Sequence, residues 1–101
     1  LYYRRDLLEK HNVQPPRTWD ELSAAARTVL AAEQGANPNL RGFSTAGAPI
    51  EGTVCTFLVP LWGQGGSLTD AQGRFVLDQA QARRALSLWA DLRSQNVTPA
   101  N

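Results

Sequence analysis

Apolar positions between Thr18 and Gly35 recur at every third or fourth residue. This spacing places them on a single stripe of a helix that can face a core; the positions are Leu22, Ala25, Ala26, Val29 and Leu30. Thr18 and Glu21 match the capping box, in which two side chains satisfy backbone N–H groups at the start of a helix. The pattern therefore predicts an amphipathic helix that begins directly after Thr18.

A shorter helix is predicted at residues 3–11. Leu7 and Leu8 form its small apolar face, and Asn12 can adopt the left-handed conformation that ends a helix. The next two prolines, Pro15 and Pro16, prevent its continuation.

The last predicted helix follows Asp78, which has Gln81 three residues further on and is expected to act as its cap. Its apolar stripe consists of Ala82, Ala85, Leu86, Trp89 and Leu92. Asn96 and Pro99 are expected to end it.

A different pattern occupies the middle of the chain, where residues 54–62 are apolar in almost every direction of a helical wheel. A helix from Pro49 or Ile50 to residues 63–66 would therefore be buried on all sides, with Cys55 as a small buried apolar residue. Pro60 lies inside it and removes one backbone hydrogen bond. The rest of the chain offers too little apolar surface to cover such a helix, which indicates that a further part of the protein covers it.

The β-structure predicted from the sequence is small. Residues 41–44 are expected to form a short strand or an extended segment, and residues 67–69 and 74–77 flank a glycine-containing turn typical of a hairpin. The predicted fold class is α+β and mainly α, with about four helices, a short strand and a small hairpin.

Composition excludes several kinds of partner and site. The 101 residues allow one domain at most, and ten Lys and Arg against nine Asp and Glu give a net charge of +1. The basic residues are scattered, so no nucleic-acid partner is predicted. One cysteine and one histidine permit neither an internal disulfide nor a multi-cysteine zinc site, and we expect no metal or cofactor.

Glu51 and Trp62 are the residues whose positions invite a functional interpretation. Most carboxylates in the chain lie at helix ends or on solvated faces, whereas Glu51 lies in a loop containing Gly and Pro at the start of the apolar helix. The helix dipole alone would favour a carboxylate there. Trp62 lies at the end of the same helix, either as a core residue or as a flat platform for a ligand.

Four motifs in a fixed order resemble one known family. They read LYYRRDLL at residues 1–8, PPRTWDEL at 15–22, EGTVCTFL at 51–58 and LWGQGG at 61–66. Together they resemble the bacterial extracellular solute-binding proteins that serve sugar importers and are related to maltose-binding protein. The resemblance implies that residues 1–101 are a single incomplete domain, part of the second lobe of a two-lobed periplasmic-binding-protein type II fold.

The same resemblance implies a function. Members of the family capture a mono- or oligosaccharide by closing two lobes and deliver it to the membrane subunits of an ABC importer, without chemistry on the sugar. This would place the parent protein in the periplasm or outside the cell, free or lipid-anchored. The expected ligand contacts are Glu51, accepting hydrogen bonds from sugar hydroxyls, then Gly52 and Thr53, with Trp62 behind them.

Two alternatives remain open on the sequence. The chain could be a stand-alone helical interaction domain that oligomerises through the apolar helix at residues 54–62. A glycoside-processing enzyme would need two carboxylates about 5 to 10 Å apart. Glu51 has no evident partner for that role, so the sequence predicts that the protein is not an enzyme.

Overall fold

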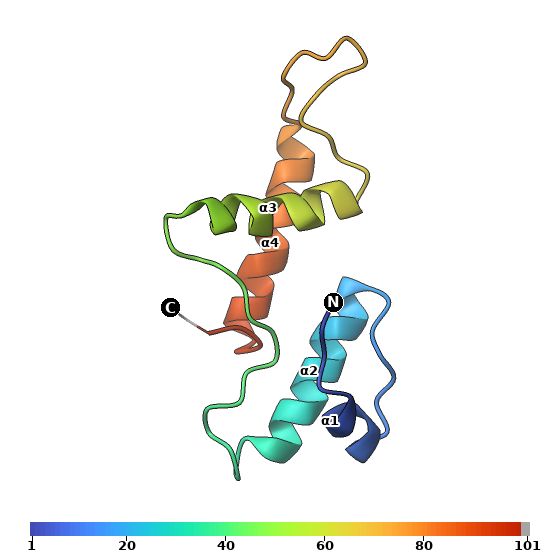
Figure 1. Cartoon of the computed structure of the whole chain (residues 1–101), viewed down its shortest axis with the longest axis vertical. Helices are drawn as coiled ribbons and strands as arrows, with labels where there is room; N and C mark the ends of the chain where they lie inside the picture. Colours follow the sequence, from blue (N-terminus) through green and yellow to red (C-terminus); the bar gives the residue numbers. More distant parts are fainter. Residues whose placement is uncertain (100–101) are drawn as a thin grey trace. The chain divides into compact units, whose positions relative to one another are not determined.

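The computed structural model describes residues 1–99, and within them the secondary structure consists of four helices (Figure 1). They are α1 (Arg5–Lys10), α2 (Trp19–Glu33), α3 (Glu51–Gly63) and α4 (Gln79–Ser94). All four predicted helices are confirmed. The described residues divide into two compact units, residues 1–44 with 92–99, and Thr45–Asp91.

The first unit is built on α2, whose start follows the capping pattern of its sequence. The Glu21 N–H donates to Thr18 Oγ1 at 3.1 Å, while the Glu21 carboxylate accepts from the Arg17 N–H at 2.7 Å. The carboxylate thus reaches one residue further back than in the usual capping box. The predicted stripe is buried at its three largest side chains, Leu22, Val29 and Leu30.

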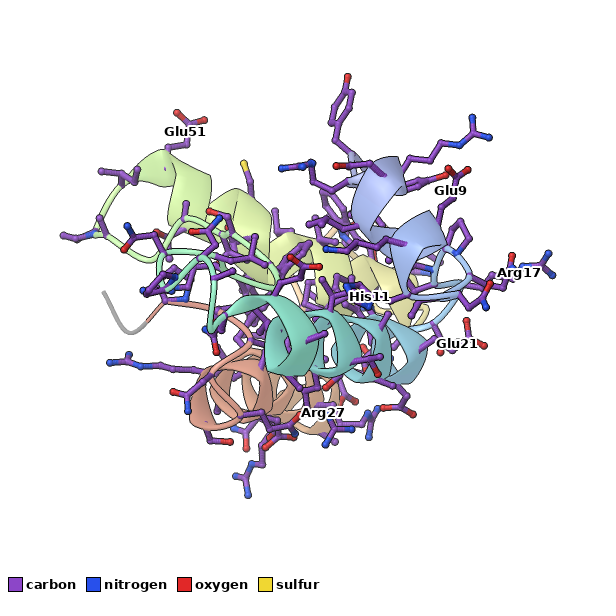
Figure 2. The ribbon with its side chains drawn as sticks, turned by 90° about the horizontal axis from the view of Figure 1, so that it is seen from below. Glu9, His11, Arg17, Glu21, Arg27 and Glu51 are labelled. Carbon is purple, nitrogen blue, oxygen red and sulfur yellow. The ribbon has the colours of Figure 1, made fainter. Side chains whose placement is uncertain are left out.

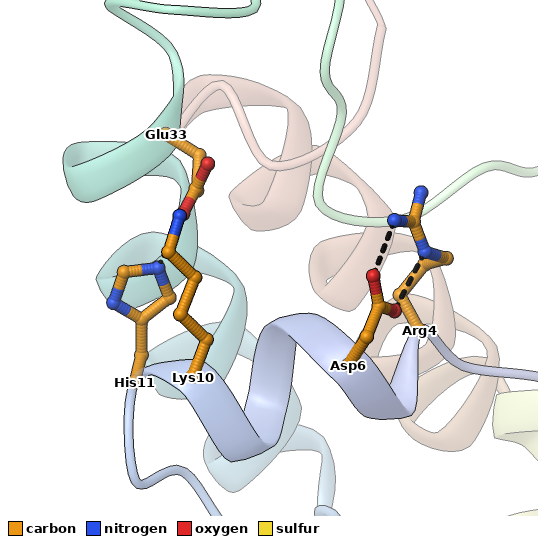
Figure 3. Close-up of polar contacts among 5 residues, drawn as sticks. All are labelled: Arg4, Asp6, Lys10, His11 and Glu33. Atoms are coloured by element: carbon orange, nitrogen blue, oxygen red, sulfur yellow. Dashed lines mark hydrogen bonds and ion pairs between the residues drawn. The ribbon is translucent and has the colours of Figure 1, made fainter.

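Helix α1 has no buried side chain and is joined to α2 by polar contacts. Lys10 Nζ and His11 Nε2 both reach Glu33 Oε1, at 2.5 and 2.7 Å (Figure 3). The hydrogen bond from Lys10, and then that from His11, holds the pKa of the Glu33 carboxyl below its usual range. At the other end of α1, Arg4 pairs with Asp6 and lowers the pKa of that carboxyl to about 2.

The segment at residues 41–44 meets the end of the chain. The N–H groups of Gly42 and Phe43 both donate to the Val97 carbonyl, at 2.8 and 2.9 Å. Of the two predicted forms, a strand or an extended segment, the strand is wrong, because these donors share one carbonyl and do not form a ladder. Glycine is required at position 42, since a Cβ there would come within 2.7 Å of the Ala26 Cβ.

In the second unit, α3 and α4 are in direct contact through a hydrogen bond between a tryptophan and a backbone carbonyl. The Trp89 indole N–H donates to the Thr56 carbonyl oxygen at 3.1 Å. Nearby, the Gln64 side chain donates to the Gln81 carbonyl at 2.8 Å and accepts from Arg84 at 2.7 Å. These contacts fasten the middle and the end of α3 to α4.

The predicted hairpin is reduced to one antiparallel bridge, between Thr69 and Phe75. Its turn is closed by Asp70 Oδ1, which accepts from the N–H groups of Gln72 and Arg74 at 2.9 Å each. The bond from the Arg74 N–H is the main reason that the pKa of Asp70 lies below its usual range.

Residues 1–99 leave α3 largely uncovered, in agreement with the prediction that the rest of the chain offers too little apolar surface to bury it. Within α3 only Pro60 and Leu61 are buried, and Leu61 has no exposed surface. Cys55, expected to be buried, is exposed. More than half of each of these large side chains is accessible: Ile50, which precedes the helix, and Val54, Val59 and Trp62. The chain thus leaves one face of α3 uncovered.

Candidate functional site at the start of α3

Glu51, Gly52 and Thr53, the ligand contacts predicted from the sequence, form the first turn of α3. Ile50 precedes it in an extended conformation and supplies no side-chain cap. Figure 2 shows the Glu51 carboxylate projecting away from the helix. The uncapped backbone N–H groups and the helix dipole make this end of the helix favourable for a carboxylate or another acceptor.

The loop before α3 is folded onto this turn. The Thr53 hydroxyl donates to the Ala48 carbonyl, and the Thr53 N–H donates to the Ile50 carbonyl at 3.0 Å. Because its proton is engaged, the Thr53 hydroxyl oxygen is left as an acceptor for a ligand donor. Gly52 allows the close approach of the loop, since a Cβ there would lie 3.3 Å from the Ala46 Cβ.

Trp62, the fourth predicted site residue, lies at the opposite end of the helix. It follows Glu51 by eleven residues, which corresponds to roughly 16 Å along a helix at 1.5 Å per residue. Eleven residues also make about three turns, so the two side chains share one face of α3. The exposed members of this outer face are Glu51, Val54, Cys55, Val59 and Trp62.

The outer face combines one carboxylate with apolar side chains and an indole. Such a surface can accept hydrogen bonds at one end and pack against flat apolar groups at the other. Among residues 1–99, no group of three or more His, Cys, Asp and Glu side chains is placed to hold a metal ion.

The sequence could not reveal one polar contact at this helix. Pro60 has no N–H, and in a regular helix its partner would be the carbonyl of Thr56, four residues earlier. The sequence thus identifies the carbonyl that loses its donor. It contains no signal that Trp89, thirty-three residues away, supplies the replacement.

The profile of the bacterial extracellular solute-binding proteins matches residues 1–100. The chain belongs to this family. A relative from Deinococcus radiodurans named "Probable ABC transporter-binding protein" is 38% identical over 89 residues, which are 85% of this chain and 21% of the relative. An uncharacterized ABC transporter extracellular-binding protein of Pyrococcus horikoshii is 28% identical over 84 residues, 83% of this chain and 20% of that protein.

A solved structure extends the likeness to three dimensions. Maltose-bound MalE3 of T. maritima is 43% identical and superimposes with a TM-score of 0.82, over 96% of this chain and 24% of that chain. The mainly helical fold is therefore that of part of one lobe of a solute-binding protein of this type. The chain spans between a fifth and a quarter of the length of these relatives.

Among residues 1–99, no helix is both long enough and apolar enough to cross a membrane. Membership of an extracellular solute-binding family implies a place of action outside the cytoplasmic membrane, in the periplasm or the extracellular space.

Proposed function

We propose that the protein containing this chain is the substrate-binding component of an ABC-type carbohydrate importer. The observation that supports a sugar ligand is the likeness to the maltose-bound MalE3, at 43% identity and a TM-score of 0.82. The ligand is a mono- or oligosaccharide, and the partners are the membrane subunits of the importer. The protein does no chemistry on the sugar.

Ligand capture occurs by closure of two lobes around the sugar, the hinge motion common to such receptors. Glu51 accepts hydrogen bonds from sugar hydroxyls, and Gly52 and Thr53 contribute backbone and hydroxyl groups. This assignment is supported by the projecting carboxylate of Glu51 and by the acceptor left on Thr53. Trp62 is a platform for a more distant ring of an oligosaccharide, since it lies about three turns away on the same face.

The protein would act in the periplasm or, where a lipid anchor retains it, at the cell surface. Most of the ligand cleft would be formed by parts of the protein beyond these 101 residues, because the chain corresponds to 24% of the MalE3 chain. The chain alone is therefore expected to bind sugar weakly or not at all.

The test is calorimetric titration of mono- and disaccharides into the full-length protein. Saturable binding in the micromolar range is expected for at least one sugar. Glu51→Gln should weaken it about tenfold or more, since hydrogen bonds to charged groups contribute about 1.5–3 kcal/mol. Glu9→Gln, at an exposed carboxylate paired with Arg5 on α1, is the matched control and should bind normally.

Two results would contradict this proposal. Absence of binding for every sugar would remove the carbohydrate ligand. Binding that Glu51→Gln leaves unchanged would remove Glu51 from the site while retaining the receptor function.

A helical interaction domain that associates through residues 54–62 is the second candidate, favoured by the exposed outer face of α3.

A further inference from the structure

We propose that Trp89 is a positioning residue for the first turn of α3, because its indole N–H replaces the backbone donor that Pro60 lacks. Only the consequence for ligand affinity rests on the proposed function. The link between Trp89 and Pro60 rests on the geometry of the second unit.

First, Pro60 leaves one backbone carbonyl of α3 without a backbone hydrogen-bond donor. In an α-helix each N–H donates to the carbonyl four residues earlier, so Pro60 leaves the Thr56 carbonyl without its helical donor. Pro60 is buried and Thr56 is half-buried, which limits the access of water to this turn. A carbonyl in such a place requires another donor.

The second step is the match between that carbonyl and the indole. The Trp89 Nε1–H lies 3.1 Å from the Thr56 oxygen. Tryptophan has one donor and no acceptor, so it complements a lone carbonyl. Ala85 lies one turn earlier on α4 and is 1% exposed, so this part of α4 is packed against its surroundings.

The third step connects Thr56 with the candidate ligand contacts. The Thr56 hydroxyl donates to the Gly52 carbonyl at 3.0 Å, one turn towards the start of the helix. Gly52 in turn lies close to Ala46 in the preceding loop. Trp89, Thr56 and Gly52 therefore form one chain of contacts that ends at the first turn of α3.

Packing of the ring alone would predict a different response to substitution. Trp89→Phe keeps an aromatic ring but removes the donor. Pro60→Ala supplies a backbone N–H for the Thr56 carbonyl, so it should make the indole donor dispensable. If Trp89 acts only by its size, Pro60→Ala cannot rescue Trp89→Phe.

The experiment compares wild type, Trp89→Phe, Pro60→Ala and the double variant in the full-length protein. Urea midpoints by circular dichroism and amide hydrogen exchange of residues 50–56 are measured for each. Trp89→Phe should lower the midpoint and speed exchange in residues 50–56 severalfold, with exchange in residues 68–76 changed less. In the Pro60→Ala background the same substitution should have little effect on either quantity.

Sugar affinity of the same four proteins completes the test. Trp89→Phe should weaken binding about five- to tenfold, and the double variant should bind within about twofold of Pro60→Ala, factors that correspond to about 1.0–1.4 and 0.4 kcal/mol at 1.4 kcal/mol per tenfold. Equal effects of Trp89→Phe in both backgrounds on midpoint and exchange would overturn the proposal. A wild-type affinity retained by folded Trp89→Phe would overturn the consequence for ligand binding, and midpoint and exchange would still decide the link to the first turn.

The outcomes remain distinguishable from failure of the proposed function. If wild type binds no sugar, the receptor assignment fails, and the midpoints and exchange rates still decide whether Trp89 positions the first turn. If Trp89→Phe alone does not fold, recovery of folding in the double variant supports the proposal, and its absence overturns it.

Discussion

Helices α2 and α3 have similar lengths, 15 and 13 residues, but they differ in how they begin and in what they bury. Helix α2 begins with a side-chain cap on Thr18 and buries one apolar stripe. Helix α3 begins without a side-chain cap, contains Pro60, and buries only Pro60 and Leu61. Its exposed apolar surface continues along the outer face.

This difference shows what each helix requires from its surroundings. The three largest side chains of the α2 stripe are buried, so local capping and periodicity suffice to describe it. The outer face of α3 is an exposed apolar surface of the kind that marks a contact site. Relatives four to five times longer offer the surface to cover it, so we expect its apolar middle, at Val54 and Val59, to be buried in the full-length protein.

The largest expected effect is that of truncating Leu61, on the buried side of α3. Leu61→Ala removes a side chain with no exposed surface and should cost about 2–5 kcal/mol of unfolding free energy. Val59→Ala, at a 52% exposed position on the same helix, should change it by about 0.5 kcal/mol or less. Urea unfolding followed by circular dichroism measures both. Equal losses would show that the two faces of α3 do not differ as described.

The outer face of α3 should make the isolated chain associate at high concentration. Val54→Lys with Trp62→Lys should weaken that association about tenfold or more, because burying each apolar side chain contributes about 1.5–3 kcal/mol. Sedimentation velocity over a range of concentrations measures the change. The control adds the same charge on α2, at the exposed Ala24 and Ala31. An equal response to both variants would mean that net charge, and not this face, governs association.

The cap of α2 should contribute less to the free energy of unfolding than the buried Leu61 side chain does. Thr18→Ala removes the oxygen that accepts from the Glu21 N–H and should cost about 1 kcal/mol of unfolding free energy. Thr18→Ser keeps that oxygen and should unfold at nearly the wild-type midpoint. A loss of the same size in Thr18→Ser would assign the effect to the threonine methyl group and not to the cap.

The smallest expected effect concerns the contact between α1 and α2. Because folding lowers the pKa of Glu33, its contribution to stability is present above the unfolded value of about 4.3 and disappears as pH falls through the folded value. Glu33→Gln should therefore melt below wild type at pH 7, and the difference should shrink below about pH 4.

Glu9→Gln on the exposed face of α1 serves as the control for this pH series and should lower the melting temperature less. A difference between wild type and Glu33→Gln that stays constant from pH 7 to pH 3 would contradict the ionic origin of the contact.

The sequence was sufficient to predict those local structures that depend on neighbouring residues along the chain. The cap at Thr18, the left-handed Asn12 and the cap at Asp78 are all present as predicted. The sequence could not decide against a strand at residues 41–44, because their partner, the Val97 carbonyl, lies 55 residues beyond Gly42.

For the candidate site, the sequence located the start of α3 but not its support. The first-turn assignment of Glu51, Gly52 and Thr53 stays a prediction that ligand binding must test. The separation of Trp62 from Glu51 follows from the helical rise and could have been foreseen. The contact of Trp89 with Thr56 could not be foreseen, because the two residues are 33 positions apart and no pattern near either of them indicates its partner.

The contact of Val97 with Gly42 and Phe43 has a consequence for the order of events during synthesis. Residues 1–44 emerge from the ribosome before Thr45–Asp91, yet Gly42 and Phe43 gain their hydrogen bonds to Val97 only after all of Thr45–Asp91 has emerged. The continuous unit can therefore fold while the discontinuous one is still waiting for its closing segment. Of these two units, the one that starts to emerge earlier is therefore completed later.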